Sequence, residues 1–114
     1  MKGFTLIELL IVVVILGILV KLAIPNFTAA RDRVKKDMCV NNLRQLKLAK
    51  EQWALENNKD YSNTPVAVDL DNYIRDGTSS LICPLDSANT FANSYNIGNI
   101  GTNPTCKIST GHRI

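Results

Sequence analysis

The sequence predicts an α+β fold in which a long N-terminal α-helix packs against a small antiparallel β-sheet. Apolar residues are concentrated at the amino end, where no charged residue occurs from Leu9 to Val20. Residues 25–57 then repeat apolar side chains at helical spacing. From Asn58 onward the composition changes to Asn, Thr, Ser, Gly and Pro, which is typical of turns and short strands. The 114 residues suit one small domain.

The size and charge of the chain exclude several classes of protein. Once the first 57 residues are assigned to the helix, only 57 remain to build a globular core. We therefore expect no enzyme, because so few residues cannot line a typical active-site cleft. The net charge of +3, from 13 basic and 10 acidic residues, gives no strong nucleic-acid footprint, although it leaves a nucleic-acid partner open.

The first apolar segment has the length of a membrane span. Phe4 to Ile24 comprises 21 residues, or about 31 Å of helix, which crosses a bilayer. No small-residue cleavage site of the Ala-x-Ala kind follows Val20, so a secretory signal peptide is disfavoured. Glu8 is unusual there, because a carboxylate inside a membrane costs about 3 kcal/mol or more. Two interpretations remain open: a functional carboxylate, or one that stays hydrated near the headgroups.

The second half of the predicted helix is amphipathic. Its apolar positions form one track and then a slightly shifted one: Phe27, Ala30, Val34 and Met38, followed by Cys39, Leu43, Leu46, Ala49 and Trp53. Asn57 and Asn58 end the pattern. A helix from residue 4 to residue 57 is longer than a 57-residue domain can cover. Half of it must therefore contact a membrane or other subunits.

Three short strands are expected in the C-terminal region, at residues 80–83, 94–97 and 105–109. A turn at residues 98–101 would join the last two, and a short helical turn is expected at residues 69–74. These elements predict a small antiparallel sheet over residues 58–114.

The residues G-F-T-L-I-E at positions 3–8, followed by the apolar run, closely resemble the amino terminus of type IV prepilins and type II secretion pseudopilins. The resemblance covers Lys2 to Phe27. It implies cleavage by prepilin peptidase between Gly3 and Phe4, N-methylation of Phe4, and a signature role for Glu8. Residues 1–3 would then be a leader peptide, 4–24 a transmembrane and assembly helix, 25–57 an amphipathic helix, and 58–114 a globular β region.

Two further residues match the family pattern. Gly17 and Pro25 stand where members commonly have a helix-loosening glycine and a kinking proline. In a filament of packed apolar helices, an unpaired Glu8 carboxylate would cost several kcal/mol. Pairing with the amine of a neighbouring subunit's Phe4 would offset this cost and set the axial register.

The cysteines permit several pairings. Cys83 and Cys106 both lie in the expected sheet region, with 22 residues between them. A bridge there would contribute about 3–4 kcal/mol to so small a domain. The resemblance favours this pair, because many pilins have a C-terminal disulfide. Cys39 lies on the apolar stripe and is expected as a packed thiol, although pairing with either other cysteine remains open.

No metal or cofactor is expected. The three cysteines and His112 could bind zinc as a Cys3His set, but no two of them are two to four residues apart. His112 also lies in the polar segment 109–113. Asp69 and Asp71 are similar to part of a calcium loop, but the full EF-hand pattern is missing, so a solvated turn is expected.

The resemblance implies a structural subunit of a type IV pilus or pilus-like filament. It would be a homo-oligomer, inserted in membrane lipid as a single-pass inner-membrane precursor and then assembled into a periplasmic or cell-surface filament. Its partners would be prepilin peptidase and the inner-membrane pilus or secretion machinery. The alternatives are a type II secretion or DNA-uptake pseudopilin, and a membrane-anchored binding domain that does not polymerise.

Overall fold

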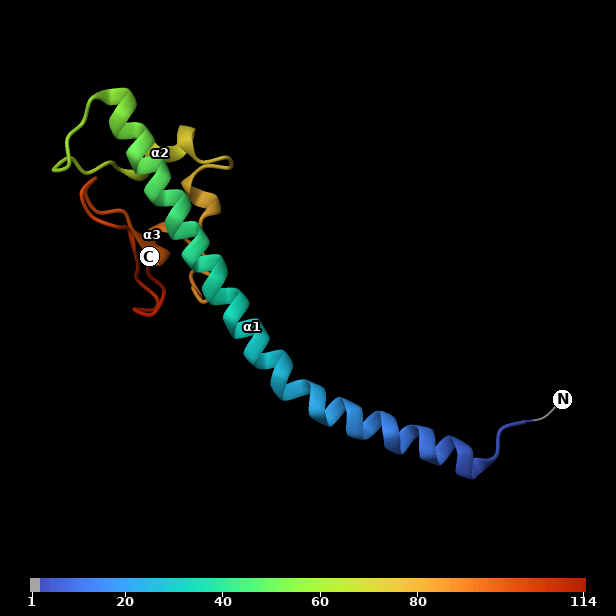
Figure 1. Cartoon of the computed structure of the whole chain (residues 1–114). Helices are drawn as coiled ribbons and strands as arrows, with labels where there is room; N and C mark the ends of the chain where they lie inside the picture. Colours follow the sequence, from blue (N-terminus) through green and yellow to red (C-terminus); the bar gives the residue numbers. More distant parts are fainter. Residues whose placement is uncertain (1–2) are drawn as a thin grey trace. The chain divides into compact units, whose positions relative to one another are not determined.

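The computed structural model describes residues 3–114. The chain forms two compact units, Met1–Arg33 and Val34–Ile114. Of the expected leader at residues 1–3, Met1 and Lys2 lie outside the described residues, and Gly3 is exposed. The elements follow in the order α1, α2, η1, η2, α3, β1 and β2. Figure 1 labels α1, α2 and α3.

Helix α1 comprises the 52 residues Leu6–Asn57, close to the predicted 4–57. Its end is marked by Asn58, whose φ of 52° lies in the left-handed region that asparagine tolerates. The N–H of Lys59 donates to the carbonyl of Ala54 at 2.9 Å, which satisfies a carbonyl left free by the last turn. The predicted stop at Asn57 and Asn58 is therefore confirmed, with a C-cap as its physical cause.

The two apolar tracks of the amphipathic segment differ in burial. The earlier track is largely exposed, with exposed fractions of 65% for Phe27 and 53% for Met38. The shifted track is buried and includes Cys39, Leu43, Leu46 and Ala49. Only the shifted track, which belongs to the second unit, therefore contributes to the core of this chain.

The rest of the second unit consists of short elements. These are α2 (Ala67–Leu70), η1 (Asp71–Tyr73), η2 (Thr78–Ser80), α3 (Phe91–Ser94), β1 (Tyr95–Asn96) and β2 (Thr105–Cys106). Strands β1 and β2 form a two-stranded antiparallel sheet in which Tyr95 pairs with Cys106. The α+β class is confirmed, and the helical turn expected at residues 69–74 corresponds to the end of α2 and to η1.

The strand predicted at residues 80–83 is wrong. Ser80 ends the 3-10 helix η2, and the following residues pair with side chains instead of with a neighbouring strand. The carbonyl of Ile82 accepts from Asn42 Nδ2 at 3.2 Å, and the N–H of Cys83 donates to Ser94 Oγ at 3.0 Å. Because these side chains satisfy the backbone groups, the segment needs no ladder partner. The other two strands occur where predicted, but with two residues each.

The core joins the second half of α1 to the C-terminal segments. Its buried members are Cys39, Leu43, Leu46, Ala49, Leu70, Ile74, Leu81, Cys83, Tyr95 and Cys106, and Trp53 is partly buried against them. Trp53, the last residue of the shifted apolar track, thus lies at the edge of the core. All three cysteines belong to this core, so the packing that buries apolar surface also brings the thiols together.

Candidate functional site

The motif at residues 3–8 forms the start of α1. Phe4 precedes the helix and is 88% exposed. Thr5 caps the helix, since its Oγ1 accepts from the N–H of Glu8 at 3.2 Å and its carbonyl accepts from the N–H of Leu9 at 3.2 Å. The T-x-x-E spacing is the sequence signature of a capping box, a signal that the sequence analysis did not use.

Glu8 therefore has a definite position in the first turn of α1. Its side chain is exposed, and it lies at the end of the helix where the macrodipole favours a negative charge. The Thr5 bond is made to the backbone of Glu8, so the cap itself leaves the carboxylate free to bind another group.

The apolar segment after Glu8 is uncovered on every side within its unit. The large apolar side chains from Leu6 to Ile24 have exposed fractions between 48 and 84%. By length and composition, α1 qualifies as a helix that can cross a membrane. A helix that is apolar all round needs lipid or other protein to cover it.

Gly17 and Pro25 both lie inside α1. A Cβ at Gly17 would meet nothing within 4 Å, so the glycine is not required by packing in the single chain. The carbonyl of Pro25 accepts from the hydroxyl of Thr28 at 2.9 Å. The kink at these residues stays a prediction.

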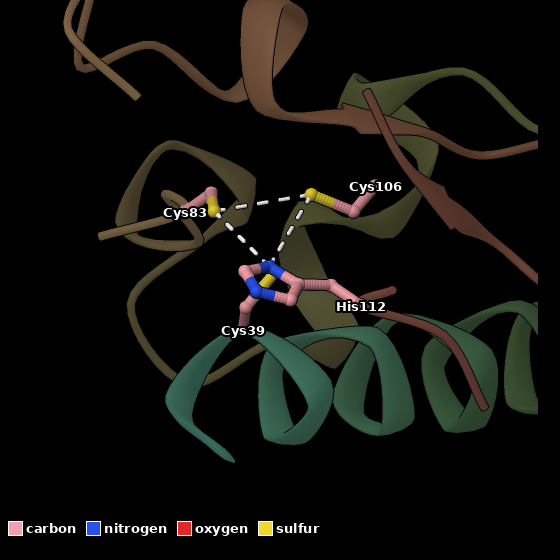
Figure 2. Close-up of side chains that lie close together, drawn as sticks. All are labelled: Cys39, Cys83, Cys106 and His112. Atoms are coloured by element: carbon pink, nitrogen blue, oxygen red, sulfur yellow. Dashed lines mark hydrogen bonds between the residues drawn. The ribbon is translucent and has the colours of Figure 1, made fainter. Parts of the chain in front are cut away.

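A second candidate site lies in the core of the second unit, where Cys39, Cys83, Cys106 and His112 converge; we call it the Cys–His cluster. The Sγ atoms of Cys83 and Cys106 are 3.8 Å apart. Nδ1 of His112 lies 3.8 Å from the first sulfur and 4.0 Å from the second. One donor atom from each of the four residues lies within 4.8 Å of all the others. Figure 2 shows the imidazole among the three thiols.

Four separate segments supply the Cys–His cluster. Cys39 comes from α1, Cys83 from the loop after η2, Cys106 from β2 and His112 from the C-terminal segment (Figure 2). Cys39 and Cys83 have no exposed surface, and Cys106 and His112 are only 9 and 7% exposed. The site is therefore closed to solvent on nearly all sides.

The structure brings together the four residues of the possible Cys3His set, although their spacing along the chain argued against a metal site. Cys83 and Cys106 lie side by side as expected, but as free thiols, and their disulfide stays a prediction. The expectation that Cys39 is a packed thiol is confirmed by its burial. The polar surroundings expected for His112 are wrong: its ring is buried against the sulfurs, which no spacing along the chain indicated.

Neighbouring groups orient the thiols. The hydroxyl of Tyr95 donates to Cys39 Sγ at 3.5 Å, and Tyr95 Oη in turn accepts from Asn42 Nδ2 at 3.0 Å. Burial raises the pKa of the Cys39 thiol to about 12 and also raises the pKa of Cys83. In the absence of a cation, these sulfurs are therefore neutral thiols at pH 7.

Asp86 organises the loop that carries Cys83. Its carboxylate accepts from the side chains of Ser94, at 2.7 Å, and Asn93, and from the N–H groups of Ala88 and Thr90. Burial alone would raise the pKa of Asp86, but these hydrogen bonds outweigh it, so its pKa lies below the usual range. Since Ser94 Oγ also accepts from the N–H of Cys83, the carboxylate fixes the position of that cysteine.

The carboxylates of Asp69 and Asp71 are used locally. Asp69 Oδ2 accepts from the N–H of Val66 at 3.0 Å, at the start of α2. Asp71 Oδ1 accepts from both the hydroxyl and the N–H of Thr78, and these bonds lower the pKa of Asp71. The two residues act as turn acceptors and share no cation site with a third acidic group among residues 3–114.

An exposed apolar helix with Glu8 in its first turn, in a chain that also forms a small α+β unit, is typical of a pilin-like protein. Comparison with known proteins agrees. Residues 1–20 match the model of the prokaryotic N-terminal methylation motif. The N-terminal region of the chain is thus similar to that of type IV pilins and of a type II secretion core protein.

Three relatives illustrate the range. The type IV major pilin PilA of Myxococcus xanthus is 44% identical over 64 residues, 54% of this chain and 29% of that protein. The type IV wide pilus major component PilA4 of Thermus thermophilus is 41% identical over 69 residues, 60% of this chain and 53% of the relative. Type II secretion system core protein G of Pectobacterium carotovorum is 34% identical over 58 residues, 51% and 37% of the two chains.

The chain thus spans between 29 and 53% of the length of these relatives. No solved structure matches it at comparable significance.

Proposed function

We propose that this chain is a structural subunit of a type IV pilus or pilus-like filament, without catalytic activity. The observation that carries the proposal is the apolar segment of α1, which is exposed on all sides and is headed by Glu8. The methylation motif at residues 1–20 and the pilin relatives support the same conclusion.

Maturation would prepare the helix for assembly. Prepilin peptidase would cut between Gly3 and Phe4, and Phe4 would become N-methylated. Removal of residues 1–3 takes away Lys2 and creates a new amine four residues before Glu8. In a bundle of apolar helices, each charge must find a partner, because an unpaired buried charge costs several kcal/mol. The amine of one subunit and Glu8 of its neighbour are complementary, and their pairing sets the axial register.

The environment of the chain follows from the same helix. Before assembly, the segment 4–24 would be covered by the lipid of the inner membrane as a single-pass anchor. After assembly by the inner-membrane machinery, neighbouring copies would cover it in a periplasmic or cell-surface filament. Gly17 and Pro25 would allow the helix to adapt to neighbours, because glycine and proline weaken the helical hydrogen bonding.

A type II secretion pseudopilin is the second candidate, favoured by the similarity to core protein G. Both candidates require processing and polymerisation, so they share the first test. They differ in the partner machinery: deletion of the secretion system would abolish assembly of a pseudopilin but leave a pilus intact.

The test uses the full chain in its own cells. After mechanical shearing, the mass of the mature protein is measured in the sheared and membrane fractions. We expect a chain that begins at methylated Phe4 in the sheared fraction. A chain that retains residues 1–3 and occurs only in membranes would contradict the proposal and leave a simple membrane anchor.

Glu8→Ala separates assembly from processing. The Thr5 cap binds the backbone of residue 8, so alanine leaves the start of the helix intact. We expect a processed chain that is missing from the sheared fraction. Glu51→Ala is the matched control, an exposed glutamate of the same helix outside the apolar segment, and it should assemble normally. If Glu8→Ala also assembles normally, Glu8 does not set the register.

A further inference from the structure

The Cys–His cluster has no role in the proposed filament function, yet it occupies the centre of the core. We propose that Cys39, Cys83, Cys106 and His112 bind one Zn²⁺ as a structural Cys3His site. This inference does not depend on polymerisation, since all four residues belong to the second unit.

The distances between the donor atoms approach those of a tetrahedral zinc site. With Zn–S bonds of about 2.3 Å, two sulfurs at the corners of a tetrahedron lie about 3.8 Å apart. Cys83 and Cys106 have this separation, and Nδ1 of His112 lies 3.8 and 4.0 Å from the two sulfurs. The fourth donor, Cys39 Sγ, completes the set within 4.8 Å. A contraction of about 1 Å or less closes the tetrahedron.

The donor set selects the class of metal. Three thiolates and an imidazole are ligands for zinc and other soft or borderline cations, whereas calcium and magnesium require oxygen. Four protein ligands leave no position for water or substrate, and the cluster is almost fully buried. Closed four-ligand sites are structural and not catalytic.

A disulfide explains fewer of the four residues. It would use Cys83 and Cys106 and would leave Cys39 and His112 buried around it with no function. Nδ1 of His112 faces both sulfurs, 3.8 and 4.0 Å away, as the nitrogen of a Cys3His site faces the other donor atoms. A cation at the centre gives every member of the cluster a ligand role.

The second unit has little regular secondary structure outside α1, so a metal site would stabilise it. Its sheet has two strands of two residues each, and most of residues 58–114 form turns and short helices. Small domains with little regular structure are commonly stabilised by a metal or by disulfides. The cluster would tie α1 to the loop at Cys83, to β2 and to the C-terminal segment, which are far apart in the sequence.

Binding exchanges protons for the metal. A Zn²⁺ ion held by three thiolates and one imidazole nitrogen carries one net negative charge, so each thiol releases its proton when the metal binds. No electron is transferred. The Tyr95 hydroxyl would continue to donate a hydrogen bond to Cys39 Sγ after that sulfur becomes a thiolate. Ser94 Oγ would continue to accept from the N–H of Cys83 and so hold that ligand in place.

The test is the zinc content of the full chain, purified in detergent without chelator and measured by elemental mass spectrometry. We expect about one zinc per chain, and at least a tenfold loss of bound zinc in His112→Ala and in Cys106→Ser. Tyr61→Phe is the matched control, because it removes the hydroxyl of a 78% exposed side chain that supplies no donor atom to the cluster; it should keep about one zinc.

Intact mass separates zinc from the competing disulfide. A zinc-bound chain, denatured with chelator, carries three alkylatable thiols, whereas a Cys83–Cys106 disulfide leaves one and lowers the mass by two hydrogens. A zinc-free chain with that disulfide would overturn the proposal. So would zinc that persists in both ligand variants.

If the ligand variants fail to accumulate in cells, a metal titration of the wild-type chain tests the proposal instead. The reduced, metal-free chain is titrated with Co²⁺, whose absorption reports thiolate ligands and tetrahedral geometry. Saturation at about one equivalent with a sulfur-to-cobalt charge-transfer band supports the site, and displacement by Zn²⁺ should abolish that band. Absence of the band in the folded chain would refute it.

Discussion

Lys50 is a buried lysine whose ammonium holds the loop between β1 and β2. The residue is only 1% exposed, and its Nζ donates to the carbonyls of Ile97 and Thr102, each at 2.7 Å. Lys50→Met keeps an unbranched side chain that is one heavy atom shorter and removes both hydrogen bonds made by Nζ. The two carbonyls lose a charged donor, and each such loss costs about 1–3 kcal/mol.

Two effects reduce this loss. Thr102 is exposed, so water can replace part of the bond to its carbonyl. Methionine also avoids the desolvation of a charge, and burial indeed lowers the pKa of Lys50. The net expectation is a decrease of about 2 kcal/mol in the free energy of unfolding.

The assay is chemical denaturation of the full chain in detergent, followed by tryptophan fluorescence. Trp53 is the single tryptophan, and it lies at the edge of the core three positions after Lys50. Lys47→Met is the matched control, an exposed lysine on the same helix that should change stability by no more than about 0.5 kcal/mol. If Lys50→Met is as stable as this control, the two bonds do not hold the loop.

Three more perturbations test the fold. The depressed pKa of Asp86 means that stability present above pH 3.8 is lost as the pH falls through the lower, folded pKa. Asp86→Asn should therefore be less stable at pH 7 and depend less on pH below 4; acid titrations parallel to wild type would refute this. Leu46→Ala, at a site with no exposed surface, should cost about 2–5 kcal/mol in denaturation; a cost below 1 kcal/mol would mean that the cavity collapses. Gly98→Ala should cost about 1–2 kcal/mol, because φ is +67° and the new Cβ would lie 2.8 Å from Thr102 Oγ1. Adding Thr102→Ala to Gly98→Ala should recover only the stability lost through the steric contact with Thr102 Oγ1. Full recovery of the free energy of unfolding would argue against backbone strain at residue 98.

The helix was the most predictable element. Its two ends follow from residues that act on their immediate neighbours, since Thr5 caps the first turn and Asn58 ends the last one. The spacing of apolar residues along the helix showed that one apolar track is shifted relative to the other. The spacing did not show which of the two tracks is buried. Met38 and Cys39 are adjacent in the sequence, and only the packing of the second unit buries Cys39 and leaves Met38 exposed.

The sheet region was less predictable. The composition indicated turns and short strands correctly, but backbone groups of Ile82 and Cys83 are bound by the side chains of Asn42 and Ser94. These partners lie 40 and 11 positions away in the sequence. A local pattern cannot show that a side chain from α1 will replace a neighbouring strand.

The sequence by itself determined the long helix, its ends and the resemblance of residues 3–8 to a prepilin processing site. All of these depend on residues at fixed, short offsets, where helical periodicity and capping act. Only the tertiary structure decided that His112 turns inward and meets Cys39, Cys83 and Cys106. Their distances depend on the paths of three connecting segments, which are set by how the core packs against α1 and not by any spacing along the chain.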